Sequence, residues 1–141
     1  MNMLIVDKVY FVGIGGIGMS ALARYFNAQG KQVGGYDKTE TPLTKALEQE
    51  GIEVHYKDNQ IPAWMLEAHH EKSLVVYTPA VPENNQELQH FRQHGFHVRK
   101  RSEVLGFITQ DSFTIAVAGT HGKTTTATIL AHVLRSCGVD C

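Results

Sequence analysis

The sequence has few cysteines, few prolines and no excess of charge of either sign. Its two cysteines, Cys137 and Cys141, lie at the carboxyl end without histidines at zinc-ligand spacing, which predicts free thiols. The formal net charge is −1, so no basic surplus points to nucleic acid as a partner. With 43% hydrophobic residues, the composition is that of a soluble globular protein.

Long apolar runs are absent as well. No run is long enough to span a bilayer, and residues 1–7 show no cationic region followed by a long apolar segment. We therefore expect a cytoplasmic protein without a membrane partner. Most of the eight histidines lie in helical or turn segments rich in Gln and Glu, where solvated surface positions are expected rather than metal ligands. These are His69, His70, His90, His94 and His97.

A glycine cluster near the amino end follows a continuous apolar run at residues 9–12, which predicts a buried strand. Residues 13–18 read Gly-Ile-Gly-Gly-Ile-Gly, and apolar residues then recur at helical spacing up to Phe26. The next expected strand, at residues 32–36, ends at Asp37, where a dinucleotide fold places its ribose-binding acid. The pattern predicts a site for a nucleotide diphosphate, either a diphosphate sugar or a nicotinamide cofactor. The alternative is a tight turn between a strand and a closely packed helix.

Strand-like and helical segments alternate along the rest of the first 108 residues. This alternation predicts an α/β fold, a Rossmann-like parallel sheet with helices on both faces. Further strands are expected at residues 52–55, 74–77 and 96–99, and helices at residues 41–50, 61–69, 84–94 and 102–108, the last capped by Ser102.

Two segments at strand ends are candidates for ligand contacts. The loop Thr78-Pro79-Ala80-Val81-Pro82 follows a strand at the edge of the sheet where open parallel sheets bind ligands. The basic run Arg99-Lys100-Arg101 could face a diphosphate or a carboxylate, but a solvated charge cluster is favoured for its first two residues.

A second glycine turn lies at residues 117–126, which read Val-Ala-Gly-Thr-His-Gly-Lys-Thr-Thr-Thr. A strand is expected before it at residues 114–118 and a helix after it at residues 124–135, which is the context of a phosphate loop. Glycines let the backbone approach an anion at the helix start, where the N–H groups and the helix dipole favour negative charge. Lys123 would reach the outer phosphates and the Thr124 hydroxyl would bind magnesium.

Only the second half of the general phosphate-loop pattern is intact, because Val117 stands where the pattern has its first glycine. An ordinary strand-to-helix turn with a solvated Lys123 is the alternative. His121 either contacts the nucleotide or fills the turn.

Residues 109–112 are polar and mark an expected domain junction. Residues 109–141 would then be the first strand, loop and helix of a P-loop ATPase domain, which cannot bury its own apolar residues. We therefore expect the amino-terminal piece of a larger enzyme, with a last segment that packs on a partner chain, adds to the first sheet or is loose.

Three segments together resemble the Mur ligases, the family that adds amino acids to the nucleotide-linked precursor of bacterial peptidoglycan. They are residues 11–20, residues 101–105 and residues 116–125. The family's ATP loop is similar and also lacks the first general glycine, which accounts for Val117. The resemblance implies three domains in the complete enzyme: a Rossmann-like domain for the UDP sugar, a central ATPase domain and a carboxyl-terminal domain that helps to bind the amino acid.

The resemblance also implies substrates and residue roles. UDP-N-acetylmuramate, ATP and L-alanine would be the substrates: ATP phosphorylates the muramoyl carboxylate, and the amine of L-alanine attacks the acyl phosphate. Lys123 would be catalytic, stabilising the transferring phosphoryl group, and Thr124 would hold Mg²⁺. ATP would contact Gly119, Thr120, His121, Gly122, Lys123, Thr124 and Thr125. The UDP sugar would contact Gly15, Gly16, Ile17, Gly18, Asp37, Thr78 and Ala80.

One departure from the family concerns Pro79, because the family more often has two serines followed by Ala-Ile at this loop. Proline offers neither a hydroxyl nor an N–H. Three other functions stay open: a related ligase that attaches a ready-made peptide to the same UDP sugar, an NAD-dependent oxidoreductase, and a binding module without catalysis. The oxidoreductase leaves the loop at residues 119–124 unexplained. We expect this chain alone to be inactive.

Overall fold

The computed structural model describes residues 5–110 and 112–140. The chain forms two compact units, Met1–Gln110 and Asp111–Cys141. The division falls within residues 109–112, where the junction was expected, and the last helix of the first unit continues two residues beyond its expected end at residue 108. Each unit is described below by itself.

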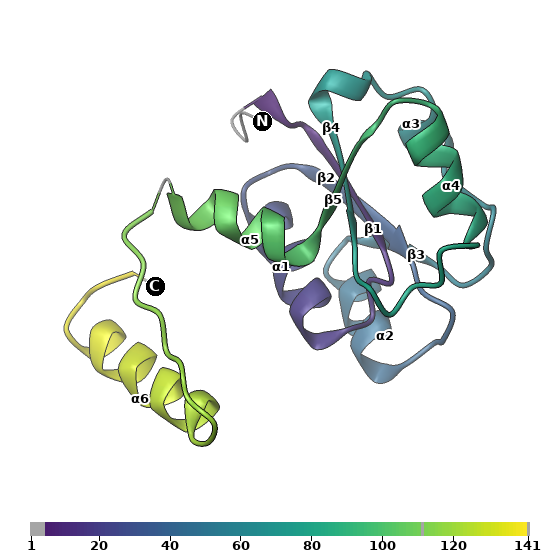
Figure 1. The fold of residues 1–141 in the computed structure, drawn as a ribbon. Coiled ribbons are helices and arrows are strands. Elements are labelled where there is room, and N and C mark those ends of the chain that lie inside the picture. The colour runs from purple at the N-terminus through teal and green to yellow at the C-terminus, as the bar shows by residue number, and fades with distance from the viewer. Residues whose placement is uncertain (1–4, 111, 141) are drawn as a thin grey trace. The chain divides into compact units, whose positions relative to one another are not determined.

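The first unit is built on a five-stranded parallel sheet in the order β3-β2-β1-β4-β5 (Figure 1). The strands are β1 (Lys8–Val12), β2 (Gln32–Tyr36), β3 (Glu53–His55), β4 (Ser73–Tyr77) and β5 (His97–Lys100). The expected strands are confirmed, with ends that differ by at most one residue. The register aligns Val12 with Tyr36 on one side and with Tyr77 on the other, so three strands end level with one another. The strand order reverses at β1, where doubly wound sheets bind their ligands.

Helices cover both faces of the sheet, as the alternation predicts (Figure 1). They are α1 (Ile17–Ala28), α2 (Pro42–Gln49), α3 (Ala63–Leu66), α4 (Gln86–Gln93) and α5 (Arg101–Gln110). Helices α1, α2 and α5 enclose one apolar core with Val9, Phe11 and Val76 of the sheet. Helices α3 and α4 enclose the other with Tyr10, Val12 and Val75. Alternate residues of β1 therefore point into different cores, which explains why the whole strand is apolar.

Local sequence accounts for two helix starts. Thr41 caps α2 in a capping box: its hydroxyl accepts from the backbone N–H of Thr44, and the Thr44 hydroxyl accepts from the N–H of Thr41. Asn85 caps α4, because its side-chain oxygen accepts from the N–H of Leu88 at 2.8 Å.

Two helix expectations were wrong in part. The helix expected at residues 61–69 is the single turn α3, after which the chain enters the short 3₁₀ helix η2 (His70–Lys72) that leads into β4. Ser102 does not cap α5, which already begins at Arg101. The Glu103 carboxylate takes the capping role by accepting from the backbone N–H of Lys100 at 2.7 Å.

The second unit contains one helix, α6 (Lys123–Ser136), close to the expected 124–135. The strand expected at residues 114–118 was wrong, since residues 113–119 are not in a strand. A strand needs a neighbour for its backbone hydrogen bonds, and residues 112–140 offer no second strand. No residue of α6 is buried, and Phe113, Ile129 and Val133 are exposed. This agrees with the expectation that the segment cannot bury its own apolar residues.

Candidate functional site

The first glycine turn connects β1 to α1 and is tied to the end of β2. The backbone N–H groups of Gly13 and Ile14 both donate to the carbonyl of Tyr36, at 2.7 and 3.0 Å. Gly13 has φ +90°, and a Cβ there would lie 2.9 Å from the Val81 side chain, so only glycine suits this position. The turn therefore lies in close contact with the loop that follows β4, which includes Val81.

Asp37 holds the glycine turn from the adjacent strand end. One carboxylate oxygen accepts from the N–H of Gly15 at 2.7 Å, and the other accepts from the N–H of Thr39 at 3.0 Å. A Cβ on Gly15 would lie 2.7 Å from the same carboxylate oxygen. The acid expected beside a ribose thus also fixes the backbone of the turn.

A pocket of about 580 Å³ opens at this edge of the sheet. It brings together Gly16, Asp37, Thr78 and Ala80, four of the residues expected to contact a UDP sugar. Gly13 of the glycine cluster and Val81 and Pro82 of the loop after β4 also line it, as do residues that sequence reasoning did not select: Tyr36, Lys38, Asp58, Asn84, Asn85 and Gln86. The Thr78 hydroxyl accepts from the N–H of Ala80 at 3.4 Å, within the loop.

The other three expected residues lie beside the pocket rather than in its lining. Gly15 is joined to the lining through Asp37. Ile17 is 86% exposed at the start of α1. Gly18 faces Arg101, whose Nη1 would lie 2.7 Å from a Cβ at that position. A guanidinium therefore stands at the first turn of α1, where a diphosphate would also find the free N–H groups of the helix.

The basic run Arg99-Lys100-Arg101, which spans the end of β5 and the start of α5, is not a uniform solvated cluster. Arg99 is partly buried, and its Nε is buried without a hydrogen-bond partner, so the expectation of a solvated residue was wrong for Arg99. Lys100 is exposed, as expected. The alternation of strand side chains accounts for this difference, since it directs one residue of β5 inward and the next outward.

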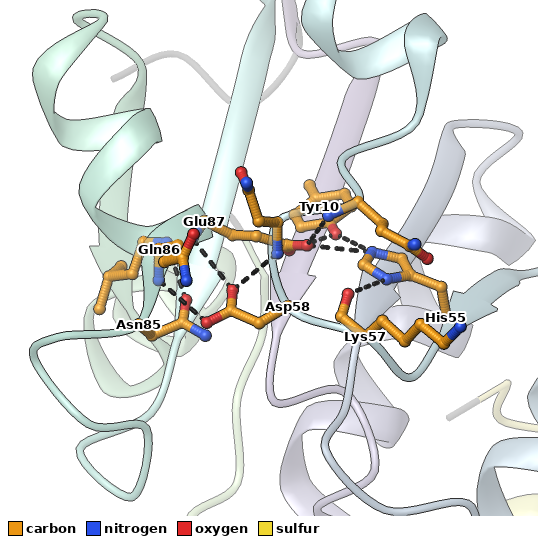
Figure 2. Close-up of polar contacts among 10 residues, drawn as sticks. Tyr10, His55, Lys57, Asp58, Asn85, Gln86 and Glu87 are labelled. Carbon is orange, nitrogen blue, oxygen red and sulfur yellow. Dashed lines mark hydrogen bonds and ion pairs between the residues drawn. The ribbon is translucent and has the colours of Figure 1, made fainter.

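The far wall of the pocket is a junction between the turn after β3 and the start of α4. The Asp58 carboxylate accepts from the backbone N–H groups of Gln86 at 3.1 Å and of Glu87 at 3.3 Å (Figure 2). With Asn85, it satisfies N–H groups that the first turn of a helix leaves free. The pair Asn84-Asn85 before a helical run is a cap signal that could have indicated this wall, but no local pattern marks Asp58.

Behind this wall lies a polar cluster made by the buried Tyr10 and Glu87 and the partly buried His55 (Figure 2). The Tyr10 hydroxyl lies 2.6 Å from Glu87 Oε2 and 2.5 Å from His55 Nε2, and that Nε2 lies 3.4 Å from Glu87 Oε1. Glu87 is fully buried, and burial raises the pKa of its carboxyl group. Burial, together with the Glu87 charge, also raises the pKa of Tyr10 far above its usual range. Sequence reasoning missed this cluster because its members come from three distant segments.

The second glycine turn is described within its own unit. Gly122 has φ +77° and precedes α6, and the Lys123 ammonium donates to the carbonyl of Gly119 at 2.6 Å. The remaining residues expected to bind ATP, namely Thr120, His121, Thr124 and Thr125, are exposed. The turn therefore has the glycine, lysine and helix start of a phosphate loop, although its preceding strand is missing. Among the described residues, no group of three His, Cys, Asp or Glu side chains is placed to hold a metal ion.

The sheet, its glycine turn and the pocket at its carboxyl edge place the first unit in the Rossmann-like class of α/β folds. The family description "Mur ligase family, catalytic domain" matches residues 8–112. The chain belongs to the Mur ligase family. In the described part of the chain, no helix is long and apolar enough to cross a membrane.

Curated relatives are similar over nearly the whole chain. A UDP-N-acetylmuramate–L-alanine ligase of Parabacteroides distasonis is 58% identical over 136 residues, which is 96% of this chain and 29% of the relative. A protein of the same name from Cytophaga hutchinsonii is 50% identical over 141 residues, 100% of this chain and 30% of the relative. The chain thus spans about a third of the length of the relatives it matches.

Solved structures give the same family. The UDP-N-acetylmuramate–alanine ligase of Thermotoga maritima superposes with a TM-score of 0.75 at 35% identity, over 91% of this chain and 29% of that protein. A murein peptide ligase of Psychrobacter arcticus superposes with a TM-score of 0.80 at 32% identity, over 95% of this chain and 27% of that protein. Both types of ligase share this fold.

Proposed function

We propose that this chain is the amino-terminal part of an ATP-dependent ligase that joins L-alanine to UDP-N-acetylmuramate, and that its first unit binds the UDP sugar. The relatives that are 50–58% identical carry the name of this ligase. The observation that carries the proposal for the first unit is the pocket of about 580 Å³, where the glycine turn, Asp37 and the loop after β4 meet. We assign residues 109–141 to the start of the ATPase domain.

The residues of the pocket fit a diphosphate and a sugar in different ways. The bare backbone at Gly16 lets a diphosphate approach the start of α1, where free N–H groups and Arg101 favour negative charge. Asp37 and the polar residues of the far wall offer acceptors and donors to hydroxyl groups and to a base edge. Pro79 leaves the loop after β4 with two donors fewer than a serine would supply, because it has neither a backbone N–H nor a hydroxyl.

In the second unit, the first turn of α6 leaves backbone N–H groups free for phosphates, and Gly122 keeps the approach open. We assign the ATP phosphates to residues 119–125, with Lys123 stabilising the transferring phosphoryl group and the Thr124 hydroxyl holding Mg²⁺. ATP supplies the phosphoryl group that activates the muramoyl carboxylate for attack by the amine. In the complete enzyme, Lys123→Met should lower kcat by about 10²-fold or more while leaving UDP-sugar binding intact.

A second candidate is the ligase that attaches a ready-made peptide to the same UDP sugar, favoured by the superposition on the murein peptide ligase. Assays of the complete enzyme with L-alanine and with the tripeptide separate these two candidates. An NAD-dependent oxidoreductase is the third candidate, and it leaves the second glycine turn without a role.

Calorimetric titration of this chain with UDP-N-acetylmuramate, with NADH as the control ligand, tests the proposal for the first unit. We expect saturable binding of the UDP sugar and none of NADH. Binding of NADH alone, or the absence of UDP-sugar binding by a folded sample, would contradict the proposal.

A further inference from the structure

The cluster of Tyr10, His55 and Glu87 lies outside the pocket lining but is hydrogen-bonded to its far wall. Glu87 Oε1 accepts from the backbone N–H of Gln60 at 3.1 Å, and the N–H of Glu87 donates to Asp58. The same residue therefore holds both ends of the turn at residues 58–60 (Figure 2). Since Asp58 lines the pocket, the state of the cluster bears on the shape of that wall.

The number of hydrogens needed by the cluster follows from its geometry. His55 Nδ1 lies 3.0 Å from the carbonyl of Lys57, which can only accept, so Nδ1 carries a hydrogen. The Tyr10 oxygen makes two short contacts, with His55 Nε2 and with Glu87 Oε2, and each needs one hydrogen between its atoms. The tyrosine hydroxyl supplies only one.

A second hydrogen must come from an imidazolium Nε2–H or from a protonated Glu87. Without it, the lone pairs of two acceptors would face each other at about 2.5 Å in a buried site, which is strongly unfavourable. The need for a second hydrogen is the same whether that hydrogen sits on His55 or on Glu87, because interacting groups share their protons.

We propose that the Tyr10–His55–Glu87 cluster holds one proton more than a neutral imidazole, a phenol and a carboxylate would carry, and that this proton positions the wall of the nucleotide pocket. Glu87 is thus a positioning residue that acts through Asp58 and Gln60. The role in the pocket rests on the proposed function, whereas the proton itself does not.

The surroundings favour the protonated form. Two neighbouring carboxylates raise the cost of a further negative charge on the cluster: Asp58 acts on Tyr10 and Glu87, and Glu53 acts on Tyr10. Next to the cluster, the Tyr36 ring lies 5.6 Å from that of His55, and Asp37 and Asp58 both raise the pKa of Tyr36. On the neighbouring elements, Trp64 Nε1 of α3 donates to Glu53, and the Lys8 ammonium of β1 donates to the Trp64 carbonyl. Loss of the proton would leave Glu87 as a buried charge close to Asp58, at the junction with the turn.

The direction of the pH dependence follows from the count of hydrogens, and the raised pKa of Glu87 agrees with it. In the unfolded chain Glu titrates near 4.3 and His near 6.5, so the extra proton is absent above about pH 6.5. The folded cluster needs this proton for its hydrogen bonds, so its stabilising effect is complete just below about pH 6.5 and is lost as pH rises through the folded value.

Glu87→Gln is the test variant, because an amide reproduces the protonated acid without needing a proton. Its carbonyl can accept from Gln60, its NH₂ can donate to the Tyr10 oxygen, and the Tyr10 hydroxyl can donate to neutral His55. Urea unfolding between pH 6 and pH 9 measures the folding equilibrium constant of each variant. The wild-type constant should fall relative to that of Glu87→Gln, by up to about tenfold per pH unit above pH 6.5.

Glu67→Gln is the matched control, because Glu67 is exposed at the end of α3, and it should keep the wild-type pH dependence. Equal pH dependence in the wild type and Glu87→Gln would overturn the proposal of a buried proton.

Calorimetry with UDP-N-acetylmuramate over the same pH range tests the positioning role. Wild-type affinity should fall where the cluster loses its proton, while the affinity of Glu87→Gln stays constant. Parallel pH profiles of affinity would overturn the positioning role. If neither protein binds the UDP sugar at any pH while their stabilities diverge, the proposed function fails and the buried proton stands.

Discussion

Gly16 is the glycine at which a side chain would alter the pocket without altering the fold. Its φ of −70° and ψ of 145° are open to alanine, and a Cβ would meet no atom closer than 3.8 Å. The added methyl would occupy the space through which a diphosphate approaches the backbone. Gly16→Ala should therefore weaken UDP-sugar binding by about tenfold or more at unchanged stability, as measured by calorimetry and urea unfolding.

The control for this change is Gly106→Ala, in α5, where a Cβ would meet nothing within 4 Å. It should leave the affinity unchanged. A Gly16→Ala variant that binds as tightly as the wild type would show that no diphosphate approaches this backbone.

Gly35 is constrained by packing rather than by a ligand. A Cβ there would lie 2.3 Å from the carbonyl oxygen of Phe11 on the neighbouring strand, and a backbone atom cannot move aside cheaply. Gly35→Ala should lower the free energy of unfolding by about 3 kcal/mol, at the upper end of overpacking effects. Gly106→Ala should instead stabilise by about 0.5–1 kcal/mol, because alanine is favoured in a helix interior. Similar free energies of unfolding for the two variants in urea would contradict the close packing of Gly35 against the strand of Phe11.

At the residue scale, site residues could be predicted from the sequence only where they belong to a contiguous motif or a known spacing. The glycine turn and Asp37 were predictable because their spacing belongs to a known unit. The cluster of Tyr10, His55 and Glu87 was not predictable, because its members are far apart in the chain and each has an ordinary structural explanation in its own segment. Tyr10 reads as one residue of an apolar strand, and Glu87 as an acid in the first turn of a helix.

At the scale of elements, the capping box of α2 offers a direct test of how local sequence sets a helix start. Thr41→Ala removes the hydroxyl that accepts from the N–H of Thr44. It should lower the free energy of unfolding by about 1 kcal/mol in urea unfolding. The control is Thr39→Ala, at an exposed position before the helix, with an expected effect within about 0.5 kcal/mol. Equal effects of the two substitutions would show that the cap does not set the stability of α2.

Strands β1 and β4 were predictable because each is an apolar run, and burial on both faces requires such runs. Strands β2, β3 and β5 are less apolar and were predictable from their places in the alternation of strands and helices. The helix expected at residues 61–69 was too long, because Ala68 packs into the core from a non-helical segment and α3 ends before it. The strand expected at residues 114–118 failed for a different reason. An apolar run shows that a segment suits a sheet, but a strand forms only where a partner strand is present.

At the scale of the whole molecule, the division at Gln110 separates the two candidate sites in the chain. Every residue that lines the candidate UDP-sugar pocket precedes Phe91, and both apolar cores are drawn from the first unit. The first unit also holds a complete sheet covered on both faces, whereas α6 has no buried residue. Among the described residues, the apolar side chains that are buried, whose burial is the main stabilising term, thus all precede the division.

A chain that ends at Gln110 should therefore fold and bind UDP-N-acetylmuramate with an affinity within about twofold of the 141-residue chain. Calorimetry on the two chains measures the affinities, and urea unfolding should give the same midpoint for both. Because the truncated chain lacks residues 119–125, it should bind no ATP while it keeps the sugar site. A large loss of UDP-sugar affinity on truncation would mean that residues beyond Gln110 complete the pocket, and the two sites could then no longer be assigned to separate units.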